Sequence, residues 1–212
     1  MRPRRPSDWV ADLGGRHELE TEVRSALAAR QDLVLLRSST NSLDRLDYQL
    51  EYSEQFVELE LKTKNQRLSQ GWQQLRPEVR EADLFVMDEL ALRKITDAGR
   101  FAFLLVWDAP NARWALWSSG DLLVASRRRH TRALDTPAGK TKGKLLFDIS
   151  EAGYICANLD AALDALVAMA AHLESWWQDI APWPQAEPLP YDAGPAEIGT
   201  GARRQAQSAY DS

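Results

Sequence analysis

The sequence has a single cysteine, three histidines and no long hydrophobic run in its 212 residues. One cysteine, Cys156, excludes a disulfide within the chain and leaves no cysteine cluster for zinc. Because it lies in an apolar, strand-like stretch, we expect it to be a core residue. No segment approaches the roughly 20 apolar residues of a membrane span, and the basic start leads into no hydrophobic signal region. These absences predict a cytoplasmic protein without a membrane partner.

An excess of positive charge is also lacking. The formal net charge of −5 argues against a protein that coats nucleic acid through its overall charge. One window differs, because seven basic residues between Arg127 and Lys144 face a single acidic residue, Asp135. Pro137 and Gly139 predict a mobile loop there, which would either contact phosphates or act as an exposed solubilising loop. The residues of this window that we predict to bind nucleic acid are Arg127, Arg128, Arg129, Arg132, Lys140 and Lys142.

Residues 47–62 predict two short strands joined by a tight turn. Polar and apolar residues alternate in both halves, as in strands with one buried face. Ser53 and Glu54 would form the connection, although type I′ turns favour Gly or Asn. Asp47 then lies opposite Glu60, with Cβ atoms about 5 Å apart, and Lys62 points to the same side. Two facing carboxylates repel each other, so we expect a hard cation to bind between them and offset the repulsion.

Asp47, followed after twelve residues by Glu60-Leu61-Lys62 at the end of an apolar strand, resembles the motif of the PD-(D/E)XK, or restriction-endonuclease-like, nuclease superfamily. Leu46 stands where the nominal motif has proline. The resemblance implies a nuclease dependent on Mg²⁺ (or Mn²⁺), in which Asp47 and Glu60 hold the metal and Lys62 orients the attacking water or stabilises charge at the phosphate. It also implies an α/β fold: a restriction-endonuclease-like core of order α-β-β-β-α-β, with a mixed sheet flanked by helices.

Two further residues match this resemblance. Residues 16–30 have helical periodicity, and Glu20 lies at the edge of the inward face, whereas Glu18 and Glu22 point further towards solvent. The resemblance implies that the first helix supplies a glutamate to the metal site, which Glu20 matches best; an acidic turn that only complements the helix dipole is the alternative. A glutamine-bearing helix follows the motif. We assign Gln73 to the site, with a solvated helix face and its competitors Gln66 and Gln70 as alternatives.

The other elements complete a nuclease domain over residues 16–181, with residues 1–15 as a flexible basic amino terminus and 182–212 as a disordered tail. A hairpin and a carboxyl-terminal helix are added to the core. The elements expected are a buried strand at Leu33–Leu36, mainly helix over 78–98 with a strand at Leu84–Met87 as the alternative, strands at Phe101–Trp107, Arg113–Trp117 and Lys144–Ile149, and a helix capped by Asn158.

The sequence therefore predicts a metal-dependent nuclease, expected to be an endonuclease, that hydrolyses phosphodiester bonds in restriction, repair or defence, with DNA favoured over RNA. Two alternatives remain: a catalytically degenerate module that binds nucleic acid or recruits a partner, and an RNA-cleaving defence effector. The apolar stripe of the last helix suits packing on the sheet or on a second subunit. By analogy, a homodimer or a partner protein is expected to use that helix.

Overall fold

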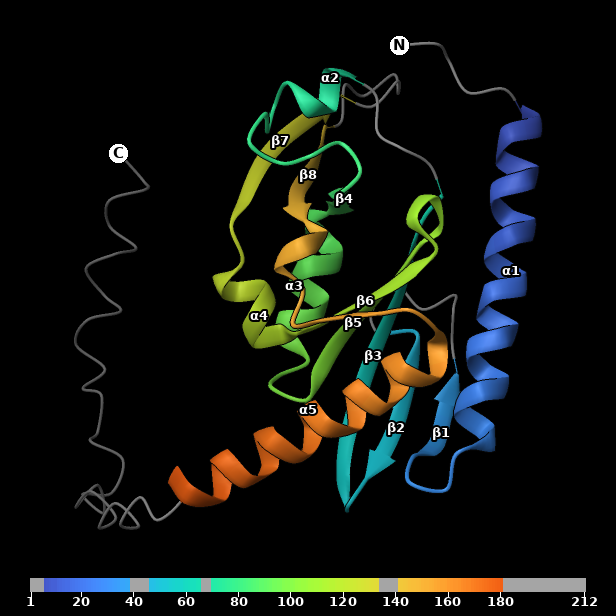
Figure 1. Ribbon diagram of the computed structural model, residues 1–212, viewed down its shortest axis with the longest axis vertical. Coiled ribbons are helices and arrows are strands. Elements are labelled where there is room, and N and C mark those ends of the chain that lie inside the picture. The colour runs from blue at the N-terminus through green and yellow to red at the C-terminus, as the bar shows by residue number, and fades with distance from the viewer. Residues whose placement is uncertain (1–5, 39–45, 66–69, 134–140, 181–212) are drawn as a thin grey trace, which may run out of the picture. The chain divides into compact units, whose positions relative to one another are not determined.

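The computed structural model describes residues 6–38, 46–65, 70–133 and 141–180 (Figure 1). Contacts divide the chain into two units, Met1–Ser175 and Trp176–Ser212, and the account below concerns the first. The elements are α1 (Pro6–Ala29), β1 (Val34–Ser38), β2 (Tyr48–Tyr52), β3 (Gln55–Lys64), α2 (Gln70–Gln73), β4 (Leu84–Asp88), α3 (Glu89–Asp97), β5 (Ala102–Asp108), the 3₁₀ turn η1 (Ala109–Asn111), β6 (Arg113–Ser118), α4 (Ser119–Val124), β7 (Arg127–Ala133), β8 (Thr141–Asp148), η2 (Ile149–Glu151), β9 (Tyr154–Cys156) and α5 (Leu159–Ile180).

A six-stranded mixed sheet of order β1-β2-β3-β5-β6-β9 forms the centre of the fold. The β3–β5 pair is parallel and the other pairs are antiparallel. Side chains of α1 and α5 pack with one face of this sheet, while α3, α4 and a second, three-stranded sheet of order β4-β8-β7 pack with the other. The expectation of an α/β fold with a mixed sheet flanked by helices is confirmed.

Alternation along β3 decides which residues enter which layer. Val57, Leu59 and Leu61 are buried in the core shared with α1 and α5. The side chains between them point to the opposite face, where the β5 residues Leu104 and Val106 contact the second sheet and α3. We call the four polar residues on this face the β3 stripe: Glu58, Glu60, Lys62 and Lys64.

The turn predicted between β2 and β3 is confirmed. Tyr48 pairs with Leu59 and Tyr52 pairs with Gln55, which leaves Ser53 and Glu54 as the two connecting residues. Their φ angles are 47° and 65°, in the left-handed region that a type I′ turn requires and that Gly or Asn adopts at lower cost. The alternating strands therefore impose the register on turn residues that do not favour it.

Replacing this pair by Ser53→Asn and Glu54→Gly is expected to stabilise the protein by about 1 kcal/mol, because both new residues tolerate positive φ. The free energy of unfolding in urea measures the gain. Glu81→Gly, at an exposed position outside the left-handed region, is the control and should not stabilise the protein. An equal or lower free energy for the turn variant would contradict the turn geometry.

Three expectations about elements are corrected or sharpened. The first helix begins at Pro6 rather than near Arg16. The strand expected at Leu33–Leu36 exists, but as β1 it forms a sheet edge with Val34 53% and Leu36 44% exposed, so it is not a buried strand. Within residues 78–98 the strand alternative is right: β4 precedes a short helix that ends at Asp97, near Gly99 with φ 96°.

The basic window is not a loop where the structure describes it. Arg127–Ala133 and Thr141–Asp148 are the antiparallel strands β7 and β8, because the apolar end of β8, with Leu145 and Phe147, is buried against the central sheet. Residues 134–140, including Lys140, lie outside the described residues, as do the tail 182–212 and residues 1–5.

The carboxyl-terminal part of the domain agrees with expectation. β5 and β6 form the expected hairpin, and Cys156 is buried at the end of β9. The Asn158 Oδ1 accepts a hydrogen bond from the Ala161 N–H at 2.8 Å, which caps α5. Among the described helices, none has both the length and the apolar character needed to cross a bilayer.

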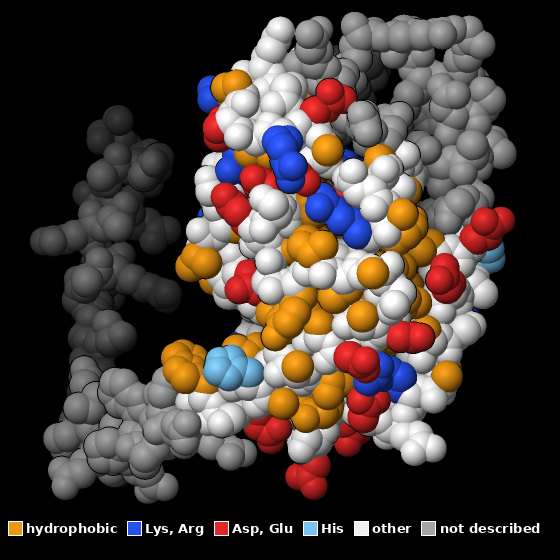
Figure 2. Space-filling view, viewed as in Figure 1, with side chains coloured by type: hydrophobic (Ala, Val, Ile, Leu, Met, Phe, Trp, Pro, Cys, Tyr) orange, Lys and Arg blue, Asp and Glu red, His pale blue; other side chains and the backbone are white. Residues whose placement is uncertain are grey.

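Apolar side chains reach the surface on the face shown in Figure 2. The exposed large hydrophobic residues of α4 are Leu123 and Val124, and those of β9 are Tyr154 and Ile155. β9 is the edge strand opposite β1. Apolar exposure is therefore found at both edges of the central sheet, whereas the apolar stripe of α5 packs against the sheet.

Candidate active site

The β3 stripe crosses the central sheet between β2 and β5, on the face that α3 covers. Alternation along β3 puts four ionisable side chains in a row on this face. The stripe contains Glu60 and Lys62, two of the three motif residues. A row of charges under a helix needs compensating partners, and these partners define the site.

Glu60 is the most buried acid of the stripe, with 3% of its surface exposed. Its Oε1 accepts a hydrogen bond from the Lys62 ammonium. Its Oε2 is buried without a hydrogen-bond donor, and the Lys94 Nζ of α3 lies 3.9 Å from it. The carboxylate therefore lies between two ammonium groups, with one oxygen still able to accept a ligand.

Asp47 lies one residue before β2, where the pairing with β3 has not yet begun. Its buried Oδ2 accepts a hydrogen bond from the Leu61 N–H at 2.9 Å. The carboxylate thus occupies the place that a strand carbonyl would take at the end of the ladder. The β2–β3 pairing has the predicted register, and its ladder ends at Tyr48 and Leu59, one position short of Asp47 and Glu60. Asp47 therefore binds the backbone of β3 between Glu60 and Lys62.

Glu20 enters from a different layer. It is buried on α1, and its backbone carbonyl accepts a hydrogen bond from the Tyr48 hydroxyl at 3.1 Å. Tyr48 belongs to the core on the α1 side of the sheet, opposite the β3 stripe. Within the described part of the chain, no three Asp, Glu, His or Cys side chains gather closely enough to hold a metal ion. The role of Glu20 as a third ligand beside Asp47 and Glu60 therefore stays a prediction.

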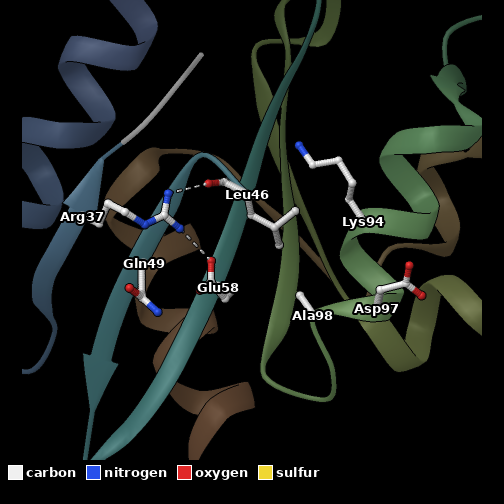
Figure 3. Close-up of a pocket in the computed structure, with 7 residues that line it drawn as sticks. All are labelled: Arg37, Leu46, Gln49, Glu58, Lys94, Asp97 and Ala98. Atoms are coloured by element: carbon white, nitrogen blue, oxygen red, sulfur yellow. Dashed lines mark hydrogen bonds and ion pairs between the residues drawn. The ribbon is translucent and has the colours of Figure 1, made fainter. Parts of the chain in front are cut away.

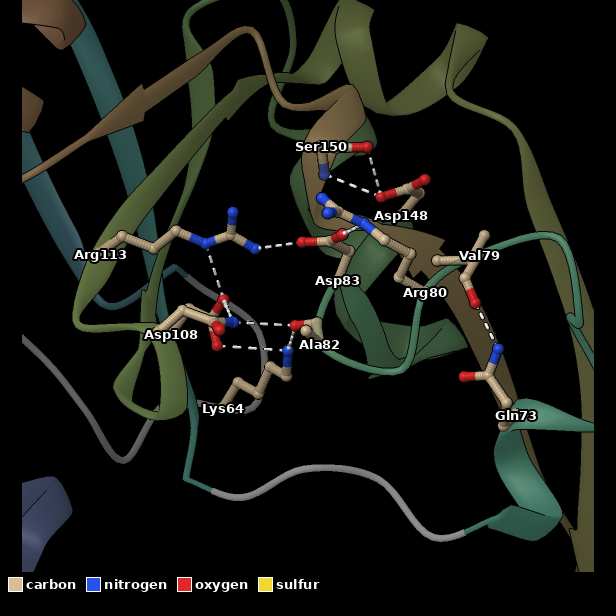
Figure 4. A network of polar contacts seen from close by, with 11 residues as sticks. Lys64, Gln73, Val79, Arg80, Ala82, Asp83, Asp108, Arg113, Asp148 and Ser150 are labelled. Atoms are coloured by element: carbon tan, nitrogen blue, oxygen red, sulfur yellow. Dashed lines mark hydrogen bonds and ion pairs between the residues drawn. The ribbon is translucent and has the colours of Figure 1, made fainter.

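Gln73 lies at the end of α2, in the segment that leads to β4 (Figure 4). Its Nε2 donates a hydrogen bond to the Val79 carbonyl, and its Oε1 is buried without a hydrogen-bond donor. This contact ties together the loop between α2 and β4. The structure places Gln73 apart from Lys64 and Asp108 in Figure 4, so the role expected for it beside the motif has no support from the geometry.

The predicted nucleic-acid contacts lie on the β7–β8 hairpin, where several form ion pairs or hydrogen bonds within the protein. Arg129 pairs with Glu89 at 2.9 Å, and Lys142 pairs with Asp88 at 2.6 Å. Arg127 donates to the carbonyls of Leu122 and Leu123. Arg128 is exposed, whereas the side chains of Arg132 and Lys140 are outside the described residues. The cluster is thus partly neutralised at the junction of β4 and α3.

Asp88 is the acid that holds the end of this hairpin. Burial alone would raise the pKa of its carboxyl, but hydrogen bonds from Lys142 and Lys144 outweigh burial and hold that pKa below its usual value of 3.8. A carboxylate with a lowered folded-state pKa stabilises the protein above its unfolded pKa, and this contribution is lost as the pH falls through the folded value. Asp88 therefore links the hairpin to the start of α3 at neutral pH.

Asp88→Asn is expected to destabilise the protein by roughly 1 kcal/mol at pH 7, and the difference from wild type should shrink between pH 4 and pH 2. Urea unfolding at several pH values measures this. In a Lys142→Ala/Lys144→Ala background the pH dependence of the same change should be lost or reversed, because the donors that lower the pKa are gone and burial, which raises it, remains. A difference that stays constant from pH 7 to pH 2 in wild type would contradict the role of the ion pairs.

Two site residues were missed or undervalued by sequence reasoning. Arg37 of β1 donates to the Leu46 carbonyl and to the Glu58 Oε2, each at 3.3 Å. Lys94 of α3 lies 3.9 Å from the Glu60 Oε2. A usable signal existed for Lys94, because Ala91, Leu92 and Ile95 form the buried face of α3 and Lys94 lies at its rim. Arg37 and Lys94 border a pocket of about 400 Å³ between the hairpin and α3 (Figure 3).

A second polar cluster joins the two sheets at the other end of β3 (Figure 4). The fully buried Asp108 lies 3.2 Å from the Lys64 Nζ and 2.9 Å from the Arg113 Nε. Arg113 also reaches Asp83 at 2.6 Å, in the loop that precedes β4. Burial lowers the pKa of Lys64, and Asp108 opposes that change. These charges compensate one another and attach β4 to the central sheet.

The site therefore consists of two acids and an amine at the start of the hairpin, a second amine from α3, and an adjoining pocket. No protein-family model matches the chain, and no curated protein matches it either. The function of the site must therefore be inferred from the positions and charges of its side chains.

Proposed function

We propose that the chain is a nuclease of restriction-endonuclease-like fold that uses Mg²⁺ or Mn²⁺ to hydrolyse phosphodiester bonds in DNA. The observation that carries the proposal is found at the open end of the β2–β3 hairpin, where Asp47 accepts a hydrogen bond from the Leu61 N–H and the flanking residues Glu60 and Lys62 are paired. The order α1-β1-β2-β3-α3-β5, with β3 and β5 parallel in a mixed sheet, adds support. α2 and β4 are then an insertion into that core, and the strands β7 and β8 that complete the second sheet follow it.

The donor set fits a hard divalent ion. Mg²⁺ is commonly held by one or two carboxylates, with waters and substrate phosphate oxygens completing its coordination. Asp47 and Glu60 would supply the two carboxylates, and the Glu60 Oε2 is a buried acceptor without a hydrogen-bond donor. An ion held there would polarise the phosphate and lower the pKa of a nucleophilic water. Glu20 and Gln73 are not needed for this set.

Lys62 supplies the positive charge that the phosphate requires. Its side chain is 30% exposed and contacts the Glu60 carboxylate, so it can reach both the ligand and an approaching substrate. With Glu60 serving as a metal ligand, the Lys62 ammonium would be available to a phosphate oxygen. There it would stabilise the negative charge that develops during hydrolysis. Lys94, on the other side of Glu60, contributes a second positive charge to the same region.

Incubation of the purified chain with supercoiled plasmid, single-stranded DNA and RNA tests the proposal. Cleavage of DNA is expected with Mg²⁺ or Mn²⁺ and should stop when EDTA is added. Equal trace cleavage with metal and with EDTA would contradict the nuclease proposal. Cleavage confined to RNA would support the RNA-cleaving alternative instead.

One observation favours a second function, a nucleic-acid-binding or partner-recruiting module with a degenerate site. Glu60 already lies between Lys62 and Lys94, so its charge is balanced by the protein itself. In that case DNA binding would survive Asp47→Ala and Glu60→Ala and would be lost when Arg127, Arg128 and Arg129 are neutralised. The nuclease proposal expects binding of Mn²⁺, measured by calorimetry, to be lost in the same two alanine variants.

A further inference from the structure

We propose that the pocket beside the β3 stripe binds one unpaired nucleoside next to the phosphate that is cleaved, so that the preferred substrate is a single strand or a frayed end. This inference rests on the proposed nuclease function and names the substrate of the same site. It concerns the pocket bordered by β1, β2, β3 and the carboxyl-terminal end of α3 (Figure 3).

The size of the pocket suits a single nucleoside. Its volume is about 400 Å³, near the lower end of the range for small-molecule sites. A base in an intact duplex is stacked and exposes only its groove edges. A recess of this kind receives a base only after the base has left the stack, which requires least energy in a strand that is already single.

The position of the pocket links it to the candidate metal site. Lys94 lines the pocket and also lies 3.9 Å from the Glu60 Oε2. Glu58, another lining residue, stands two residues before Glu60 on the same face of β3, a separation of about 7 Å along a strand. One nucleotide can therefore touch both places, with its phosphate near Glu60 and Lys94 and its nucleoside beside Glu58.

The chemistry of the lining favours a nucleoside over a free anion. Among the lining residues that the structure describes, two cations, Arg37 and Lys94, are matched by two acids, Glu58 and Asp97, so these side chains carry no net charge together. Gln49 adds an amide that both donates and accepts. Base edges present donors and acceptors together, as this lining does. Leu46 and Ala98 provide apolar contact for the base, and none of the described lining residues is aromatic, so recognition through base edges is expected rather than stacking on a ring.

Fluorescence anisotropy with a labelled 12-nucleotide single strand, and with the blunt duplex of the same sequence, tests the inference. Ca²⁺ replaces Mg²⁺ so that no cleavage occurs. We expect the full chain to bind the single strand about tenfold more tightly than the duplex. Gln49→Ala should weaken single-strand binding about tenfold, as for the loss of a base-edge contact, and leave duplex binding unchanged. Gln55→Ala, at the start of β3 near the turn, is the matched control and should bind like wild type.

Ala98→Phe keeps the test decisive if Gln49→Ala affects folding. It places a ring in the pocket from the exposed end of α3 and should remove the preference for the single strand while the circular dichroism spectrum stays that of wild type. Equal binding of strand and duplex by wild type, or an unchanged preference in both pocket variants, overturns the inference even if DNA is cleaved. Single-strand binding that depends on Gln49 supports the subsite even if no cleavage is found, and then only the nuclease proposal fails.

Discussion

Lys62→Ala is expected to lower the metal-dependent cleavage rate by about 10²- to 10³-fold, the effect of removing one charge-stabilising group from a hydrolytic site. Glu60→Gln should lower it at least as much, because an amide neither carries the charge nor binds Mg²⁺ as a carboxylate does. The two changes act on different parts of the reaction. Single-turnover cleavage of plasmid at saturating Mg²⁺ measures the rates.

Metal binding separates the two roles. Glu60→Gln should weaken Mn²⁺ binding in calorimetry, whereas Lys62→Ala should retain it, because the lysine contacts the ligand and is not a ligand itself. Two control variants remove a matching charge at an exposed position: Arg24→Ala removes a positive charge, as Lys62→Ala does, and Glu81→Gln removes a negative charge, as Glu60→Gln does. Both should cleave at the wild-type rate. If Lys62→Ala cleaves as fast as Arg24→Ala, the nuclease assignment to this hairpin is wrong.

The largest loss of stability is expected from Asp108→Ala, by about 3 to 5 kcal/mol. Asp108 is fully buried between Lys64 and Arg113 and accepts a third contact from the Asn111 side chain at 2.6 Å. Its removal leaves the Lys64 ammonium buried without its acid. Urea unfolding at pH 7 measures the change in free energy.

Two further variants distinguish a buried-charge effect from a general loss of packing. Asp164→Ala removes a 2.8 Å ion pair with Arg30, but that carboxylate is 70% exposed, so a loss of less than about 1 kcal/mol is expected. Adding Lys64→Met to Asp108→Ala should recover part of the stability, because the uncompensated charge is then gone as well. No recovery would show that the cluster contributes through packing alone.

The central hairpin was predictable because its evidence is local. Alternation from Tyr48 to Tyr52 and from Val57 to Leu61 fixes the buried face, and a two-residue turn then fixes the register. That pattern was strong enough to overrule the unfavourable turn residues Ser53 and Glu54. The position of the candidate site followed from it, since Glu60 and Lys62 are two residues apart on the same strand.

The second sheet was not predictable in the same way because its pairs are distant in sequence. Leu84–Asp88 pairs with Thr141–Asp148, and nothing local in the first segment indicates the second. Without that pairing, the charges of the basic window indicated a loop. The same limit applies to Arg37 and Lys94, which reach the hairpin from β1 and α3 through tertiary packing, and to the cluster around Asp108, whose members come from four separate segments.

The pairing of β4 with β8 sets an order for the folding of the chain. More than fifty residues separate Asp88 from Thr141, so during synthesis β4 emerges long before the strand that completes its sheet. Until then β4 lacks the strand with which it pairs, and late closure of distant segments slows folding. This stretch is therefore where a growing chain is most open to association with its neighbours.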